Sequence, residues 1–255
     1  MKVIILKSLT GVFFFVMLLM NYLANALPLN QRNTGEISDM YPSYFTPSGF
    51  TFSIWGVIYI LLSILLVKIL ITPNSVFFIE YPEKLIYLFI ASSILNALWL
   101  VAWHYDYMII SSVVMILLFG ALIWIAFYIP SLDTLTKTVF SIYAGWISIA
   151  LIANITITLI KLNIPLFQNN EVVWYIIIMV VGVVIGVTTL VVFKNFPYYL
   201  VFIWAYFGIF MKHLNQSGYH LGRNYILFNG TLLATLMLSG IVLFILNNYK
   251  FFEVS

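Results

Sequence analysis

The chain contains no cysteine and very few charged residues. Of its 255 residues only 7% are charged, whereas about a quarter of the residues of an ordinary soluble domain are charged. The lack of cysteine excludes disulfides, thiolate nucleophiles and cysteine-ligated iron–sulfur clusters. Because 64% of the residues are hydrophobic, we expect a polytopic integral membrane protein.

Motifs for common enzyme chemistry are also missing. The sequence has no HExxH pair on a helix, no glycine-rich phosphate loop and no Ser-His-Asp spacing. No Asp or Glu lies in the middle of an expected helix, which disfavours proton-coupled transport. His213 and His220 fall in a polar connection, where a solvated loop is favoured over a metal site. We therefore expect no metal and no required cofactor, and an enzyme is disfavoured.

Charge gives little indication of a partner. The net charge of +3 is spread thinly over loops, so it offers no argument for nucleic acid, and we expect no such partner. The partners expected are membrane lipid and a hydrophobic small molecule.

Long apolar stretches predict an all-α bundle of eight transmembrane helices. They span about residues 8–27, 51–71, 85–103, 108–129, 135–162, 172–193, 196–211 and 225–246. The first stretch follows Lys2 and Lys7 and also has the features of a cleavable signal peptide.

The basic residues predict an orientation for an eight-span chain. Seven of the eleven Lys and Arg lie on the side of the N-terminus, at positions 2, 7, 68, 84, 137, 194 and 250. The other four are at positions 32, 161, 212 and 223. The positive-inside rule then places both termini in the cytoplasm.

The longest polar connection, residues 28–50, is expected to form a lid. Loops of this length are usually functional or disordered, and the aromatic Phe45 favours a packed one. Pro42 and Pro47 stiffen the chain, and Ser48 is placed to cap the helix that follows.

Aromatic and polar residues recur at helical spacing after this loop. Trp55 and Tyr59 are four residues apart on one helix face, and Asn96 and Trp99 share a face of the next. An aromatic pair beneath a lid suits a flat apolar ligand, although an aromatic belt at the membrane interface is the favoured explanation of the pair taken by itself. Asn96 needs a partner, either on a neighbouring helix or on a ligand.

Three short segments resemble the TspO/MBR family of tryptophan-rich sensory proteins, also called translocator proteins. They are Phe-Thr-Pro-Ser-Gly-Phe-Thr-Phe-Ser-Ile-Trp-Gly-Val-Ile-Tyr at 45–59, Leu-Asn-Ala-Leu-Trp at 95–99, and Tyr-Ala-Gly-Trp at 143–146. The resemblance covers about residues 8–163. It implies a five-helix core over 1–163 with the lid at 28–50, and it leaves three extra helices in 164–255 outside the family pattern.

The resemblance also implies a ligand and a site. In the family the lid covers a pocket for porphyrins, haem-like tetrapyrroles or sterol-like lipids. Carried over to this chain, the pocket residues are Trp55, Tyr59, Asn96, Trp99, Trp146 and Ala150, and the lid residues are Pro42, Phe45 and Pro47.

Three functions are compatible with this pattern. A membrane receptor or carrier that senses or translocates a flat hydrophobic ligand is favoured. The alternatives are a secondary transporter of small solutes and, less favoured, a porphyrin-degrading membrane enzyme. Gly182 and Gly186 have the small-xxx-small spacing that allows close helix packing, so a homodimer is a further expectation.

Overall fold

The structure, a computed structural model, describes residues 1–26, 29–130, 132–215 and 222–252. These residues form helices and their connections and contain no strand. Seven of the described helices are long and apolar enough to cross a membrane. The expected all-α membrane bundle is thus confirmed.

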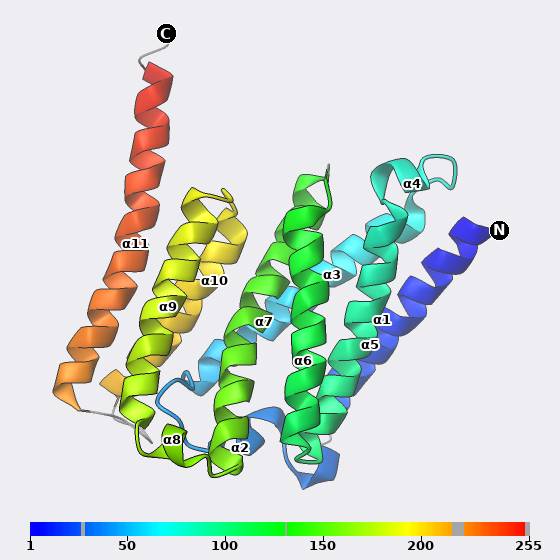
Figure 1. Cartoon of the computed structure of the whole chain (residues 1–255). Helices are drawn as coiled ribbons and strands as arrows, with labels where there is room; N and C mark the ends of the chain where they lie inside the picture. The colour runs from blue at the N-terminus through cyan, green and yellow to red at the C-terminus, as the bar shows by residue number, and fades with distance from the viewer. Residues whose placement is uncertain (27–28, 131, 216–221, 253–255) are drawn as a thin grey trace. The chain divides into compact units, whose positions relative to one another are not determined.

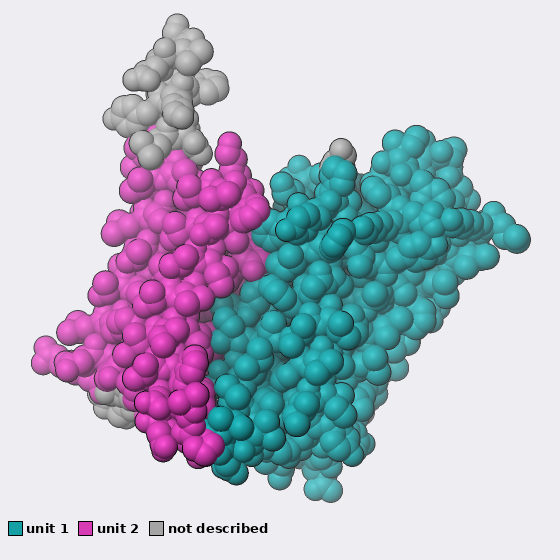
Figure 2. Space-filling model, viewed as in Figure 1, with its two compact units in different colours: residues 1–41, 53–164 teal, residues 42–52, 165–255 magenta. Residues whose placement is uncertain are grey.

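The chain divides into two compact units, which Figure 2 colours separately. Unit 1 consists of residues 1–41 and 53–164, and unit 2 of residues 42–52 and 165–255. The last of the three breaks, after residue 164, lies next to the expected boundary at 163. The segment 42–52, which we expected to be part of a lid on the first five helices, is grouped with the last three helices instead.

Unit 1 is built from five long helices, drawn from blue to green in Figure 1. They are α1 (Lys2–Ala26), α3 (Ile54–Ile71), α5 (Glu83–His104), α6 (Met108–Ile123) and α7 (Thr134–Lys161). The shorter elements of unit 1 are η1 (Leu29–Gln31), α2 (Thr34–Asp39), α4 (Phe77–Glu80) and η3 (Trp124–Tyr128), whereas η2 (Gly49–Ser53) falls almost entirely in the segment that belongs to unit 2. Helix α5 packs against α1 and α6, and α7 packs against α6 and α3. Aromatic residues of α3, α5 and α7 can therefore meet inside the unit.

Unit 2 contains three long helices that pack on one another in every pair. They are α9 (Glu171–Val191), α10 (Phe196–Leu214) and α11 (Arg223–Phe252), preceded by the short α8 (Pro165–Gln168). Gly182 and Gly186 of α9 allow close packing, as their spacing predicts. A Cβ atom on Gly186 would lie 3.0 Å from Leu236 of α11 and 3.4 Å from Phe202 of α10.

Helix α10 differs from the seventh span that the sequence predicts. It is 19 residues long, but it is not among the seven candidate membrane spans. Tyrosines and the basic pair Lys212 and His213 lower its hydropathy. The helix also continues to Leu214, beyond the expected end at residue 211, so His213 lies in its last turn rather than in a polar loop.

Asp133 marks the start of α7 and links it to α3. Its carboxylate accepts hydrogen bonds from the backbone N–H groups of Leu135 and Thr136 and pairs with Lys68 at 3.1 Å. Burial opposes ionisation of this carboxyl, but the hydrogen bonds from Thr136 and Lys68 outweigh it and lower the pKa of Asp133. Because such a cap satisfies otherwise free N–H groups, Asp133 fixes where α7 begins.

Candidate ligand-binding site

Five aromatic side chains of unit 1 form one cluster around Trp55. The Trp55 ring stacks on Tyr59, with centroids 5.5 Å apart, and on Trp99 of α5, with centroids 6.3 Å apart. Tyr143 and Trp146 of α7 meet the Trp55 ring edge-on, at 6.0 and 6.3 Å. Three helices thus bring together four of the six residues that the resemblance assigned to the site, and Tyr143 joins them.

The cluster is closed on all sides except near α3. Trp99 and Trp146 are 5% and 1% exposed and Tyr143 is fully buried, whereas Trp55 and Tyr59 are half-buried. The stacked ring centroids are 5.5 and 6.3 Å apart, which is less than the about 7 Å that a flat molecule lying between two rings would need. Any flat ligand must therefore displace a ring, and Trp55 and Tyr59 are the two at the accessible edge.

A chain of buried hydrogen bonds runs beside the aromatic rings and joins four helices. Tyr59 Oη donates to Asn21 Oδ1, Asn21 Nδ2 donates to Asn96 Oδ1 at 2.8 Å, and Asn96 Nδ2 donates to Tyr143 Oη at 2.9 Å. Asn96 therefore has its partners on neighbouring helices, the first of the two explanations that the sequence allowed. Asn21 and Tyr143 were not among the predicted site residues. Two sequence features could have pointed to them. Asn21 is an amide in an otherwise apolar helix, and Tyr143 is a phenol one turn before Trp146.

Beyond Trp146, helix α7 is used mainly for packing. Ala150, the sixth predicted site residue, is half-buried one turn further along. Asn154 accepts a hydrogen bond from Ser112 of α6 at 2.7 Å and donates one to Ser111 at 2.7 Å. These bonds join α6 to α7 away from the aromatic rings.

The first part of the expected lid covers the end of α5. Pro28, at its start, lies outside the described residues. The indole N–H of Trp103 donates to the Thr34 carbonyl at 3.2 Å, and Asn30 Nδ2 donates to the His104 carbonyl at 2.9 Å. Residues 29–41 therefore pack on the helix that carries Trp99.

Asp106 holds the end of this segment. Tyr41 Oη donates to Asp106 Oδ1 at 2.9 Å, and Lys161 pairs with Asp106 Oδ2 at 2.5 Å. Burial, followed by the bond to Asp106, raises the pKa of Tyr41 to about 12, so the phenol stays protonated and keeps donating at neutral pH. The three side chains tie the segment to the turn after α5 and to the end of α7.

The second part of the expected lid is bound to α10 within unit 2. Ser48 donates to the Gly208 carbonyl through its backbone N–H at 3.1 Å and through Oγ at 2.7 Å. The indole N–H of Trp204 donates to the Thr51 carbonyl at 2.9 Å. The prediction that the Ser48 side chain caps the next helix is wrong, because its hydroxyl is used here. The same segment contains the three predicted lid residues Pro42, Phe45 and Pro47.

Comparison with known families identifies the chain. The sequence profile described as TSPO-like protein matches residues 7–247. The chain belongs to the TSPO-like family. Searches of curated proteins and of solved structures found no match.

The extent of the TSPO-like match corrects one expectation. The sequence had suggested that the family pattern stops near residue 163 and that the last three helices lie outside it. The match instead extends through α9 and α10 into α11. The last three helices are therefore part of this family's pattern, which the core motifs alone did not reveal.

The described histidines of this TSPO-like chain, His104 and His213, are not part of a cluster of metal-binding side chains. No group of three or more His, Asp or Glu within the described ranges is arranged to hold a metal ion. His213, expected in a solvated loop, is only 1% exposed and lies 3.0 Å from the Tyr44 carbonyl and 3.4 Å from Tyr175 Oη. That expectation is wrong, because α10 carries His213 into the interior of unit 2. His220 lies outside the described residues.

Proposed function

We propose that the protein is a membrane receptor or carrier that binds a flat hydrophobic ligand at the Trp55 cluster, for sensing or translocation. The ligand classes are porphyrins, haem-like tetrapyrroles and sterol-like lipids. One observation carries the proposal: a half-buried tryptophan in contact with four other aromatic rings from three helices. Membership of the TSPO-like family supports it.

The geometry suggests how a ligand would enter. Trp55 and Tyr59 occupy the accessible edge, while the more deeply buried rings of Trp99 and Trp146 form a fixed wall. When Trp55 turns outward, a flat ligand takes its place and recovers the ring contacts that Trp55 gives up. Binding therefore replaces the stacked Trp55 ring by the stacked ring system of the ligand.

A fluorescence titration tests this proposal. Purified protein in detergent is titrated with protoporphyrin while tryptophan emission is followed and corrected for inner-filter absorption. We expect saturable quenching. In Trp146→Phe we expect up to about tenfold weaker binding, because each aromatic contact contributes about 0.5–1.5 kcal/mol. Trp55→Ala removes the ring that the ligand displaces, so it should bind at least as tightly as the wild type.

Trp174→Phe provides the matched control. This variant also lacks one of the seven tryptophans, but Trp174 is 38% exposed on α9 in unit 2. The variant should therefore bind protoporphyrin with the affinity of the wild type. Linear, unsaturable quenching in all four proteins would show that the cluster binds no flat ligand.

The polar residues that a small-solute path would need are already used in packing. Lys212 Nζ donates to the Ser43 carbonyl at 3.1 Å, Asn229 accepts from Tyr175 at 2.5 Å, and Asn96 joins three helices. No contact among the described residues favours such a path over the aromatic site.

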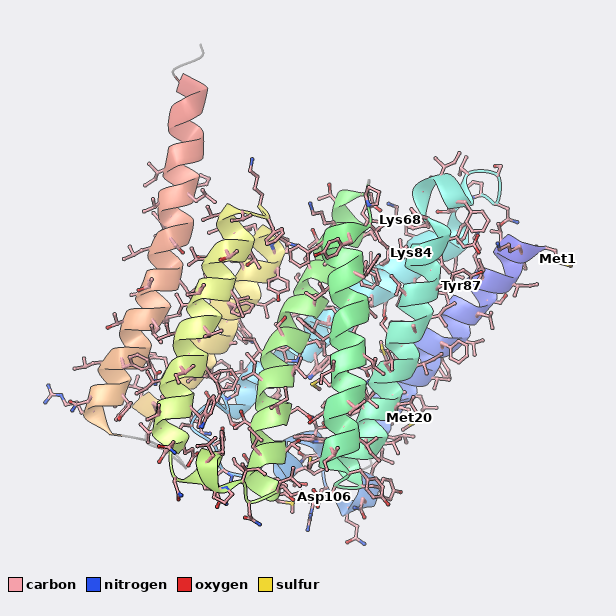
Figure 3. All side chains as sticks on the ribbon, in the orientation of Figure 1. Met1, Met20, Lys68, Lys84, Tyr87 and Asp106 are labelled. Carbon is pink, nitrogen blue, oxygen red and sulfur yellow. The ribbon has the colours of Figure 1, made fainter. Side chains whose placement is uncertain are left out.

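We also propose that the end of unit 1 near Met1 faces the cytoplasm. Met1, Lys68 and Lys84 lie at this end in Figure 3, and Asp106 lies at the other. The end near Met1 carries the lysines at 2, 7, 68, 84 and 137, whereas Arg32 and Lys161 are the basic residues at the opposite end. By the positive-inside rule the N-terminus is cytoplasmic, and the C-terminus lies on the same side if α10 crosses the membrane in addition to the seven candidate spans.

Single-cysteine labelling measures this orientation, and the natural lack of cysteine provides a clean background. Ser75 lies in the loop after α3 and Tyr107 in the turn before α6, and both are exposed. In intact cells a membrane-impermeant maleimide should label Tyr107→Cys but not Ser75→Cys, which should react only after the membrane is opened. The reverse pattern would contradict the proposal.

A further inference from the structure

The outward face of α6 is an exposed apolar stripe that ends in two aromatic residues. Ile110, Val113 and Leu117 follow helical three- and four-residue spacing and are each more than half exposed. The same row continues two turns later to Trp124 and Tyr128 of η3, which are also exposed. Because α6 and η3 together are a candidate membrane span, acyl chains lie along this stripe, and the two aromatic side chains mark the level of the head groups.

The ammonium group of Lys84, in the first turn of α5, lies over the Trp124 ring. Its Nζ is 3.9 Å from the ring centroid, which is within the range of a cation–π contact. Both residues are exposed, and Figure 3 shows Lys84 at the end of unit 1 that carries Met1. Since α5 packs on α6, a positive charge is held at the aromatic end of the stripe.

No ion pair joins Lys84 to a carboxylate within the part of the chain that the structure describes. The neighbouring Glu83 has other partners, because it pairs with Lys2 at 2.7 Å and accepts a hydrogen bond from Tyr87 Oη at 2.6 Å. The Lys84 ammonium is thus exposed, held in place by a ring and not neutralised by a carboxylate. Such a group is suited to a charge-assisted hydrogen bond from an anion.

The charge balance of unit 1 favours an anion at the same end. The end that carries Met1 has five lysines, at 2, 7, 68, 84 and 137, and three carboxylates, at 80, 83 and 133, so its net side-chain charge is +2. The opposite end has two basic residues, at 32 and 161, and three carboxylates, at 36, 39 and 106, so its net side-chain charge is −1. Basic residues at a membrane surface attract anionic lipids.

We propose that an anionic phospholipid binds along the α6 stripe with its phosphate group at Lys84. Its acyl chains lie on the apolar side chains, Trp124 lies at the level of the head group, and the ammonium donates to the phosphate oxygens. A zwitterionic lipid fits the same stripe, but its own cation cancels much of the phosphate charge. The surface therefore selects head groups with a net negative charge. This inference goes beyond the proposed function and does not depend on the Trp55 cluster.

Two phospholipids with identical acyl chains test this selection. Palmitoyl-oleoyl phosphatidylglycerol and palmitoyl-oleoyl phosphatidylcholine are added separately to the delipidated protein in detergent, and native mass spectrometry measures the affinity of the first lipid that binds. We expect phosphatidylglycerol to bind about fivefold more tightly, which is the effect of one lysine near a membrane surface. Equal affinity for the two lipids would overturn the proposal.

Lys84→Gln assigns the preference to this position. Without the ammonium group the ratio of the two affinities should fall to about one, whereas phosphatidylcholine should bind as it does to the wild type, because the apolar stripe is unchanged. Lys194→Gln is the matched control. It also removes one exposed lysine, from the connection between α9 and α10 in unit 2, and it should keep the fivefold ratio.

Two outcomes for these variants would contradict a lipid site at Lys84. One is a ratio that persists unchanged in Lys84→Gln, and the other is a ratio that falls equally in Lys84→Gln and Lys194→Gln. Either would mean that anionic lipid is attracted by the overall basic charge of the chain. The protoporphyrin titration is measured separately, so failure of this proposal leaves the proposed function intact.

Discussion

Replacing Gly182 by alanine is expected to lower the free energy of unfolding by about 3 kcal/mol, from overpacking and a lost buried hydrogen bond. A Cβ atom at this position would overlap Tyr206 Oη and lie 3.2 Å from Tyr206 Cζ. The Tyr206 ring is 1% exposed, and its hydroxyl donates to the Met179 carbonyl at 2.5 Å. The ring therefore has to move and give up that bond, and alanine's better helix propensity offsets only about 1 kcal/mol.

Thermal unfolding in detergent measures this effect, and Gly120→Ala is its control. Gly120 lies within α6, and an added Cβ there would meet no atom within 4 Å, so that variant should be as stable as the wild type or slightly more stable. In a Tyr206→Phe background the cost of Gly182→Ala should shrink, because the overlapping oxygen is absent. Equal stability of the two alanine variants would show that α9 and α10 do not approach as closely as described.

The same packing changes how Gly182 and Gly186 are interpreted. The sequence linked Gly182 and Gly186 to close helix packing and used them as one argument for a homodimer. Within unit 2, Tyr206 covers Gly182, and Leu236 and Phe202 cover Gly186. These glycines therefore hold one chain together, and a homodimer interface would have to use another surface.

Helices and the aromatic cluster were predictable from local patterns. A run of about 20 apolar residues is stable across a bilayer as an α-helix, and residues three or four apart share a face of that helix. Trp55 with Tyr59, and Tyr143 with Trp146, follow this rule, so each pair reaches the cluster together. Once α3 and α7 pack on each other, these pairs meet.

The division of the lid was not predictable in this way. Residues 42–52 bind Gly208 and Trp204, about 150 positions further along the chain, and no local periodicity encodes a contact of that range. The ring centroid of Phe50 lies 5.6 Å from that of Trp204 and 5.8 Å from that of Phe207. The sequence around Phe50 does not indicate either contact. His213 was misplaced for a related reason, since its burial depends on Tyr44 and Tyr175 and not on its polar neighbours in sequence.

Asn96→Leu is expected to cost about 2 kcal/mol of stability, because removing one member of a buried hydrogen-bonded pair leaves the other unsatisfied. Asn96 is fully buried, accepts from Asn21 and donates to Tyr143. Asn21 Nδ2 keeps its bond to the Met17 carbonyl at 2.9 Å, so most of the cost falls on the Tyr143 hydroxyl, which is also fully buried. Because the Tyr143 ring contacts Trp55, protoporphyrin binding should weaken as well.

A double-mutant cycle with Tyr143→Phe separates this cost from a general loss of packing. Replacing both partners by apolar groups leaves no unpaired atom, so Asn96→Leu/Tyr143→Phe should be less destabilised than the sum of the single variants by about 1 kcal/mol. Asn25→Leu is the control, because Asn25 is exposed and its side chain donates to the Asn21 carbonyl of its own helix. Its stability should change by less than about 0.5 kcal/mol. If the stability costs of the two single variants simply add in the double variant, Asn96 and Tyr143 contribute through packing alone. The hydrogen bond between them would then not align α5 with α7 behind Trp55.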